Sequence, residues 1–173
     1  MSWSERAKQI RAIIFDVDGV LTDGRVGYAP DGVRVKFFNV RDGTAIRLAL
    51  DAGLRVGFLS GRSDPGTLER AKELRVSFVY TGSTDKAATF DRLLDEQSLE
   101  PEQCLYVGDD VLDVSTLRRA GIGVAVADAA PEAREAADLV LESRGGAGAA
   151  RETVERLLRA QERWETALSS LVG

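Results

Sequence analysis

The stretch Ile13–Gly24, IIFDVDGVLTDG, decides the fold of this chain. Its first residues belong to an apolar run over 12–17, in which Asp16 is the one polar residue. An apolar run of this length is typical of a strand buried on both faces of a parallel sheet. Asp16 and Asp18 fall at the carboxyl end of that strand, and Gly19 follows them. The stretch therefore predicts a buried strand that carries two acidic residues to one edge of a sheet.

Strand and helix patterns alternate through the rest of the chain. The predicted strands cover 54–59, 76–80, 103–107, 123–127 and 138–141. The predicted helices run from an Asp42 cap to Gly53 and over 64–74, 86–97 and 113–120, with two more beginning at Pro131 and at about Ala149. This alternation predicts an α/β fold, a Rossmann-like open parallel sheet with helices on both faces. We expect a single domain over 1–173, in which 145–173 form a glycine-rich tail and a C-terminal helix.

A β-hairpin is predicted at about 25–38, where Pro30 and Gly32 supply turn chemistry between two short strands. An isolated two-stranded hairpin is marginally stable, so its apolar side chains need a partner. Neither this segment nor 61–85 has room for a cap domain that could close a site. We therefore expect neighbouring subunits to cover the site, because an open site would leave a reaction intermediate exposed to water.

Composition excludes several classes of protein. The net charge of -5 argues against a nucleic-acid binder, which carries concentrated basic surface. The single Cys104 allows no internal disulfide, and the chain has neither a membrane-spanning apolar run nor a signal peptide, which predicts no membrane association and a cytoplasmic location. The chain contains no histidine, which removes histidine-based nucleophile systems and histidine metal sites. Carboxylates are thus expected to move protons, and any metal should be a hard cation held by oxygen.

The candidate site residues gather where predicted strands end, and ligands of open parallel sheets bind at that edge. Carboxylates brought together there would repel one another without a cation, and Mg²⁺ is the natural occupant. Two acids spaced i, i+2 on an extended segment project to the same side, so one can attack while the other transfers a proton. A hydroxyl and an ammonium group nearby would hold the oxygens of a transferring phosphoryl group. The residues of this set are Asp16, Asp18, Ser60, Lys86, Asp109, Asp110 and Asp113.

The set resembles the haloacid dehalogenase superfamily, in the motifs DVDG, LSGR, Lys86 and GDDVLD, which occur in that order. The resemblance implies that Asp16 is a nucleophile that forms an aspartyl-phosphate and that Asp18 protonates the leaving alcohol and then activates water. It also implies that Ser60, Gly61 and Lys86 bind phosphate. Mg²⁺ would be held by Asp16, the Asp18 main-chain carbonyl and Asp109, while Asp110 and Asp113 would orient the waters on the metal.

A narrower resemblance covers nearly the whole chain. The motifs DVDGVLTDG, KFFNVRDG, LSGR, GDDVLD, VAVADA and GGAGAARE are similar to those of 3-deoxy-D-manno-octulosonate 8-phosphate phosphatases. That family implies a cytoplasmic, Mg²⁺-dependent homotetramer that releases phosphate from a phosphorylated sugar acid during lipopolysaccharide precursor synthesis. It also implies that the hairpins assemble centrally and that the glycine-rich tail reaches an active site. Arg62, Arg41 and Arg151 are the resulting candidates for contacts with the sugar acid.

Alternatives remain at the level of the sequence. A phosphatase of sialic-acid-type 9-phosphates shares the chemistry, but that group tends to carry an acidic residue where this chain has Arg62. A non-catalytic oligomeric scaffold of the same fold, or a phosphotransferase, is a further possibility. The segment 145–152 could be a plain linker. Lys36 and Arg41 could be solvated, as basic residues near a hairpin usually are.

Overall fold

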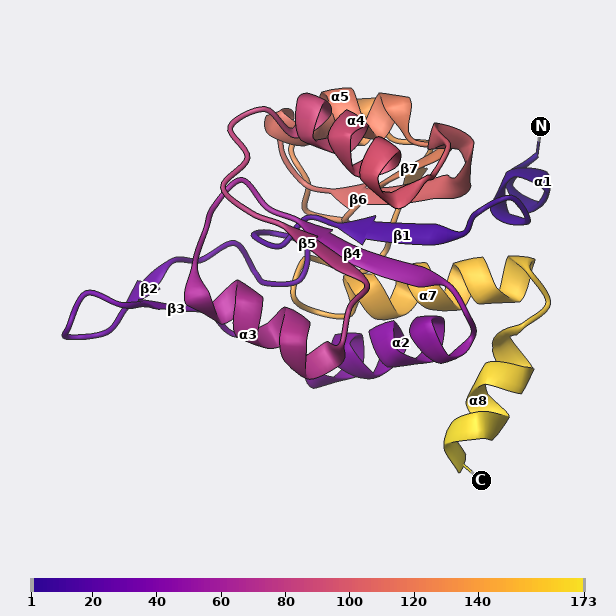
Figure 1. The fold of residues 1–173 in the computed structure, drawn as a ribbon, viewed down its shortest axis with the longest axis horizontal. Helices are drawn as coiled ribbons and strands as arrows, with labels where there is room; N and C mark the ends of the chain where they lie inside the picture. The colour runs from indigo at the N-terminus through magenta and orange to yellow at the C-terminus, as the bar shows by residue number, and fades with distance from the viewer. Residues whose placement is uncertain (1, 173) are drawn as a thin grey trace.

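The computed structural model describes residues 2–172, in which six strands form one sheet with every neighbouring pair parallel (Figure 1). The strand order is β5-β4-β1-β6-β7-β8. The strands are β1 (Ala12–Phe15), β4 (Arg55–Leu59), β5 (Phe78–Tyr80), β6 (Cys104–Gly108), β7 (Ile122–Ala125) and β8 (Leu139–Val140). The predicted α/β class with an open parallel sheet is confirmed.

Helices lie on both faces of this sheet, as predicted. In Figure 1, α4 and α5 cover one face, and α2, α3 and α7 cover the other. The α-helices are α1 (Trp3–Ala7), α2 (Val40–Asp51), α3 (Pro65–Leu74), α4 (Lys86–Gln97), α5 (Val114–Arg119), α6 (Pro131–Ala136), α7 (Ala149–Ala160) and α8 (Trp164–Val172), and the short 3₁₀ helices are η1 (Pro101–Gln103) and η2 (Val111–Asp113). Among the described residues, no helix combines the length and the apolar composition needed to cross a membrane.

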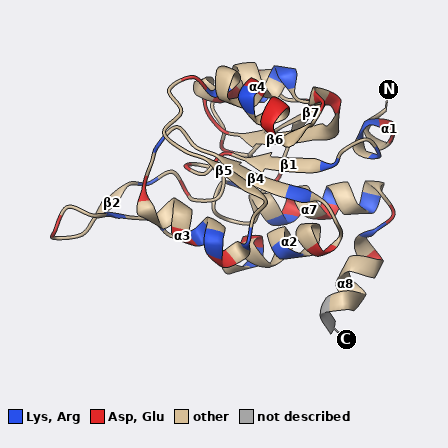
Figure 2. Ribbon diagram, in the orientation of Figure 1, with Lys and Arg blue, Asp and Glu red and all other residues tan. Residues whose placement is uncertain are grey.

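The centre of the sheet determines where a ligand can bind. From β1 the chain adds β4 and β5 on one side, then returns to place β6, β7 and β8 on the other, so the order reverses between β1 and β6. Every residue of β1 and β6 is buried, and Ile14 lies between Gly57 of β4 and Tyr106 of β6. Figure 2 shows charged residues mainly on the helices and loops, and β1 and β6 contain none. The crevice at the carboxyl ends of β1 and β6 is therefore the expected binding position.

The start of α2 differs from the prediction. Its cap is Asn39, whose side chain accepts a hydrogen bond from the backbone N–H of Arg41, and the helix begins at Val40 rather than at Asp42. Asp42 is buried inside the first turn, where its carboxylate accepts from the backbone N–H groups of Gly148 at 3.3 Å and Arg151 at 2.8 Å. Asp42 thus caps α7 from outside that helix, a long-range role that the local cap pattern did not indicate.

The hairpin lies within the predicted range and projects away from the sheet (Figure 1). Its strands are β2 (Gly27–Tyr28) and β3 (Arg34–Val35), and they pair antiparallel. Residues 61–85 hold only α3, β5 and their connections, as expected for a chain without a cap domain there.

The glycine-rich segment at 145–148 is packed against the loop that follows β1, so the plain-linker interpretation is wrong. Gly146 N–H donates to the carbonyl of Val20 at 2.9 Å, and Gly145 N–H donates to Asp128 at 2.9 Å. A Cβ on Gly145 would collide with the carbonyl oxygen of Gly19, which requires glycine at this close approach. The glycine-rich segment therefore packs against the loop that contains Asp18 and helps to hold it in place.

The C-terminal part of the chain is two helices instead of the single helix predicted. The break follows α7, where Glu162 has a left-handed backbone with φ 59°. Trp164 then begins α8 and is buried, and the guanidinium groups of Arg151 and Arg159 lie 4.7 and 5.4 Å from the centroid of its ring. Trp164 is therefore part of the core, and the two guanidinium groups add cation–π contacts to its packing.

Candidate active site

Asp16 is the first residue after β1, and the sheet fixes its backbone. Its N–H donates to the carbonyl of Val107 in β6 at 2.9 Å, and its side chain is buried. One carboxylate oxygen accepts from the backbone N–H of Val17 at 2.7 Å, and the other pairs with Lys86 Nζ at 2.8 Å. Burial raises the pKa of Asp16 to about 6, because Lys86 offsets only part of the loss of hydration and the Asp113 carboxylate adds repulsion.

Lys86 is the first residue of α4 and joins two acidic residues. Its ammonium group lies 2.8 Å from Asp16 and 2.6 Å from Asp113, with the side chain only 5% exposed. Burial alone would lower the pKa of Lys86, but the two carboxylates outweigh it and raise the pKa above its usual value. The group therefore stays a cation beside the Asp16 carboxylate, as a phosphate-binding residue should.

Asp113 is fully buried and accepts four hydrogen bonds. Lys86 and the hydroxyl of Tyr106, at 2.6 and 2.5 Å, bind one oxygen. The backbone N–H groups of Asp109 and Asp110, at 3.0 and 3.1 Å, bind the other. These donors occupy both oxygens, so Asp113 shapes the turn after β6 and orients Lys86. The side chain of Asp110 is exposed and caps η2 through the N–H of Val111.

Asp109 has a buried carboxylate oxygen that fits a cation. Within residues 2–172, its buried Oδ1 finds no hydrogen-bond partner, although buried carboxylate oxygens are normally satisfied. Burial, with the charges of Asp16 and Asp113, raises the pKa of Asp109 to about 8. Oxygens of these three carboxylates all lie within 4.8 Å of one another. Since Asp113 is already occupied by donors, Asp16 and Asp109 are the side chains that fit a hard divalent cation.

Gly19 allows this arrangement. Its φ of 90° lies in the left-handed region, and a Cβ at this position would collide with the carboxylate of Asp109. The glycine after the second carboxylate is therefore required both by the backbone turn and by the approach of β6 to the loop.

Asp18 lies in the same loop but has a different partner. Its Oδ1 pairs with Lys36 Nζ at 2.8 Å, and its side chain is 21% exposed. Its carboxylate does not belong to the three-carboxylate cluster found among the described residues. A metal contact through the main-chain carbonyl of Asp18 stays a prediction.

Ser60 follows β4 and is fully buried. Its N–H donates to the carbonyl of Tyr80, and its hydroxyl oxygen accepts from the N–H of Arg62 at 3.2 Å. These bonds fix the turn that brings Gly61 and Arg62 to the edge of the sheet.

A hollow of about 390 Å³ collects most of the predicted residues at this edge. Its lining consists of Asp16, Asp18, Gly61, Arg62, Ser83, Thr84, Lys86, Asp109, Asp110 and Leu112. Ser60 and Asp113 lie behind this lining, since they contact Arg62 and Lys86 respectively. The site thus combines a buried carboxylate nucleophile candidate, a second acid and a buried cation.

Arg41 and Arg151 are not brought to this hollow. They line a separate one of about 470 Å³ between the start of α2 and α7. The side chain of Arg151 pairs with Glu155 at 3.4 Å and stacks on Trp164. Within one chain, these two arginines therefore do not reach the acidic site.

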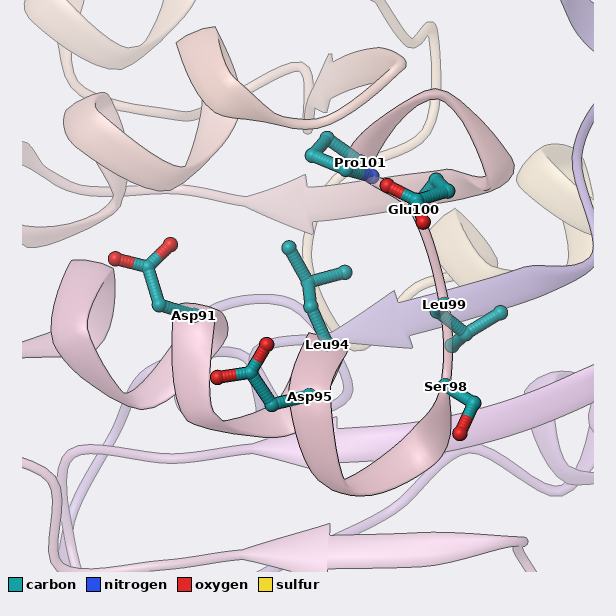
Figure 3. Close-up of a pocket in the computed structure, with 7 residues that line it drawn as sticks. All are labelled: Asp91, Leu94, Asp95, Ser98, Leu99, Glu100 and Pro101. Atoms are coloured by element: carbon teal, nitrogen blue, oxygen red, sulfur yellow. The ribbon is translucent and has the colours of Figure 1, made fainter.

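Another hollow, of about 460 Å³, lies between α4 and the segment that leads from its C-terminal end into η1 (Figure 3). Its floor is Leu94 and Leu99, and its rim carries the carboxylates of Asp91, Asp95 and Glu100. Among the residues that the structure describes, no basic one lines this hollow, so it does not suit an anionic ligand.

Sequence reasoning missed Lys36 and Tyr106. For Lys36 the alternatives were a ligand contact or a solvated residue, and nothing in its local pattern indicates a buried ion pair with Asp18. Tyr106 sits in the apolar strand CLYVG, and a buried phenol needs a hydrogen-bond partner. That requirement could have linked it to a neighbouring carboxylate.

Comparisons with known proteins agree with this geometry. A family of haloacid dehalogenase-like hydrolases matches residues 76–152. The 3-deoxy-D-manno-octulosonate 8-phosphate phosphatase KdsC of Escherichia coli is 40% identical over 162 residues, which cover 94% of this chain and 86% of that protein. Fold and site thus define a haloacid dehalogenase-like hydrolase.

Solved structures narrow the class. A probable YrbI family phosphatase from Pseudomonas syringae superposes with a TM-score of 0.94 at 42% identity, covering 98% of this chain and 97% of that one. The 3-deoxy-D-manno-octulosonate 8-phosphate phosphatase from Moraxella catarrhalis, solved with magnesium ion, phosphate ion and KDO, gives a TM-score of 0.94 at 33% identity and covers 97% of each chain. The chain belongs to the 3-deoxy-D-manno-octulosonate 8-phosphate phosphatase family.

Proposed function

We propose that this protein hydrolyses 3-deoxy-D-manno-octulosonate 8-phosphate to the free sugar acid and phosphate, with Mg²⁺ as cofactor. The observation that carries the proposal is the pair of buried Asp16 and half-buried Asp109, in which a carboxylate held by Lys86 lies close to a buried oxygen without a protein partner among the described residues. The magnesium, phosphate and KDO in the related Moraxella structure support the same ligands here. Lipopolysaccharide precursor synthesis is the corresponding pathway.

In the first step Asp16 attacks phosphorus, the bond from phosphorus to the sugar oxygen breaks, and Asp18 gives its proton to that oxygen. The products of this step are the sugar acid and an aspartyl-phosphate. In the second step a water gives a proton back to Asp18 and attacks phosphorus, which releases phosphate and restores the Asp16 carboxylate. Both steps balance without any redox partner.

The remaining residues hold charge in place. Lys86, the Ser60 hydroxyl and the Gly61 N–H would hold phosphoryl oxygens, and Arg62 at the rim would contact the sugar acid. When Mg²⁺ is bound, Asp16, Asp109 and the main-chain carbonyl of Asp18 would hold it, and its charge stabilises the phosphoryl oxygens. Asp110 and Asp113 would orient the surrounding waters and side chains.

We also propose a homotetramer whose subunits cover one another's sites, in the cytoplasm. Support comes from apolar side chains exposed around the hairpin, including Tyr28 at 70%, Phe37 at 82% and Val40 at 78%. Apolar patches of this kind mark interaction surfaces. Arg41 and Arg151 could contact sugar acid only across such an interface. The buried thiol of Cys104 fits a reducing compartment.

The test is phosphate release from 3-deoxy-D-manno-octulosonate 8-phosphate, with Mg²⁺ or with EDTA, by the unaltered protein and by Asp16→Asn. We expect the variant to lose about 10³-fold or more of the activity, while Asp95→Asn, exposed on α4, keeps it. Full activity of Asp16→Asn would contradict the mechanism. Higher kcat/KM on a sialic-acid-type 9-phosphate would favour that alternative, and no release from either substrate would favour a scaffold.

A further inference from the structure

Lys36 lies just after β3, at the base of the hairpin, and its side chain turns inward. Only 5% of it is exposed, although it belongs to a hairpin that projects from the molecule. Its ammonium group lies 2.8 Å from Asp18 Oδ1, 2.6 Å from Asp64 Oδ2 and 3.2 Å from Thr67 Oγ1. Three partners at such distances occupy the three donors of a lysine and fix its position.

The two partners besides Asp18 belong to the start of α3. Asp64 is the N-cap of that helix, with a side chain only 1% exposed, and accepts from Thr67 N–H at 3.0 Å. Nearby, Arg34 of β3 donates to the carbonyl of Ser63 at 3.0 Å. Figure 1 shows the base of the hairpin beside the first turn of α3. Lys36 is thus anchored on a rigid element that does not carry the loop of Asp18.

The site contains two acids held by two different lysines. Lys86 pairs with Asp16, and Lys36 pairs with Asp18. The loop after β1 would otherwise leave Asp18 free to rotate, because its side chain is 21% exposed while that of Asp16 is 7% exposed. Among the described residues, Lys36 is the one side chain that forms an ion pair with Asp18.

We propose that Lys36 is a positioning residue for the proton transfer performed by Asp18, an inference that rests on the proposed function. By binding Oδ1, Lys36 leaves Oδ2 as the oxygen that carries the proton and sets its direction. In the first step the O–H bond at Oδ2 breaks as the proton bonds to the departing sugar oxygen. Lys36 keeps all its protons and touches neither substrate nor metal.

The test compares two phosphomonoesters whose leaving groups differ in their need for a proton. The sugar alkoxide must be protonated as it leaves, whereas p-nitrophenolate is stable without a proton. The ratio kcat/KM includes only steps up to departure of this group. We expect Lys36→Met to lower kcat/KM for 3-deoxy-D-manno-octulosonate 8-phosphate by about 10- to 100-fold and for p-nitrophenyl phosphate by about 3-fold or less.

The comparison stays valid if the variant folds poorly, because both substrates are measured on one preparation and the folded fraction cancels from their ratio. Lys36→Arg, which keeps the charge and the donors, should recover part of the ratio, and Lys72→Met, exposed on α3, should leave it unchanged. An equal loss on both substrates, or no loss on either, would overturn the positioning role while leaving the phosphatase function standing. Absence of activity in the unaltered protein on both would overturn the proposed function and this role with it.

Discussion

Asp42, buried in the first turn of α2, accepts a hydrogen bond at 2.8 Å from the backbone N–H of Arg151 at the start of α7. The helix that follows the glycine-rich segment is thereby capped by a side chain from more than a hundred residues earlier in the chain. Because the N-cap residue of α7 is Gly148, which has no side chain, this contact replaces the usual local cap.

Replacement of Asp42 should therefore destabilise the protein. Asp42→Ala leaves the N–H groups of Gly148 and Arg151 without this acceptor, and we expect a loss of about 1–3 kcal/mol in the free energy of unfolding. Urea denaturation measures it. The control is Asp51→Ala in the same helix, where an exposed ion pair with Arg47 at 3.7 Å should contribute much less. Equal effects of the two variants would contradict the capping role.

The acid cluster should make stability without metal decrease as pH rises. The pKa of Asp16 is raised to about 6 and that of Asp109 to about 8, so the folded chain holds protons that the unfolded chain has released. Stability contributed by such groups is complete below their unfolded pKa and is lost as pH rises through the folded values. The loss starts above the unfolded pKa of about 4 and ends near the folded pKa of Asp109. In EDTA, Tm should therefore fall between about pH 6 and about pH 8, where Asp109 accounts for the fall, and Mg²⁺ should remove most of it.

Other carboxyl groups do not obscure this window. Carboxyl groups with lowered pKa values contribute stability that is complete above their unfolded pKa and is lost only as pH falls below it. Above about pH 6 these groups are ionised in both the folded and the unfolded state, so their contribution no longer changes with pH. They are Glu5, Asp64, Asp128, Asp138 and Glu152. Burial raises the pKa of Asp42, so its contribution has the same sign as that of the cluster. Asp109→Asn should flatten the dependence in EDTA. A Tm that rises with pH over this range would show that the cluster is not strained without metal.

Replacing one carboxylate at a time should distinguish Asp109 from Asp110 as a ligand of Mg²⁺. Asp109→Asn should weaken Mg²⁺ binding by about 100-fold or more, as measured by calorimetry, because it removes the oxygen that has no protein partner among the described residues. Asp110→Asn is the matched control, since its carboxylate is exposed and already bonded to Val111 N–H. It should cost about tenfold at most. An equal or larger effect at Asp110 would place the metal elsewhere.

Two glycines in the loop after β1 provide a second matched pair. Gly19 and Gly24 both have left-handed backbones, with φ of 90° and 77°, but only at Gly19 would a Cβ collide with Asp109. Alanine should cost about 1–2 kcal/mol of stability at either position through backbone strain. We expect the activity of Gly19→Ala to be lower than that of Gly24→Ala by about tenfold or more, because the collision displaces Asp109. Comparable activity of both variants would argue against that contact.

Assembly should respond to the exposed face of the hairpin. Tyr28 and Val33 are 70% and 50% exposed in the single chain, and Tyr28→Ser with Val33→Ser removes most of their apolar surface. Light scattering should show a mass below that of a tetramer, with reduced phosphatase activity. Tyr28→Phe keeps the ring and should keep the assembly. A monomer with full activity would contradict the proposal that neighbouring subunits cover the site.

The parts of the fold that could be predicted are those that depend on local pattern. The apolar run before Asp16, the turn residues of the hairpin and the alternation of strands with helices located the sheet, and the carboxyl ends of its strands located the site. Lys86 and Asp109 were placed by their position after a strand. These features follow from periodicity and chain direction, which short stretches of sequence encode.

The parts that could not be predicted depend on contacts between distant segments. Asp42 was read as a cap for its own helix, because the acceptor pattern is local, whereas its partners are at 148–151. The burial of Lys36 was not indicated by its local pattern, because it depends on Asp64 and Thr67, which lie beyond α2 and β4. Arg151 was matched to a ligand by family motif, yet Trp164 and Glu155 occupy it within this chain.

The double attachment of Lys36 divides the hairpin into two parts with unequal freedom to change. Residues at the tip of the hairpin can be substituted as long as the surface of the neighbouring subunit remains complementary to them. New quaternary arrangements can arise through such substitutions. The residue that follows β3 cannot change in the same way, because the ammonium group of Lys36 pairs with both Asp18 and Asp64. A hairpin exchanged between members of this family should therefore be joined on the tip side of Lys36, so that the contacts of Lys36 with Asp18 and the start of α3 are kept.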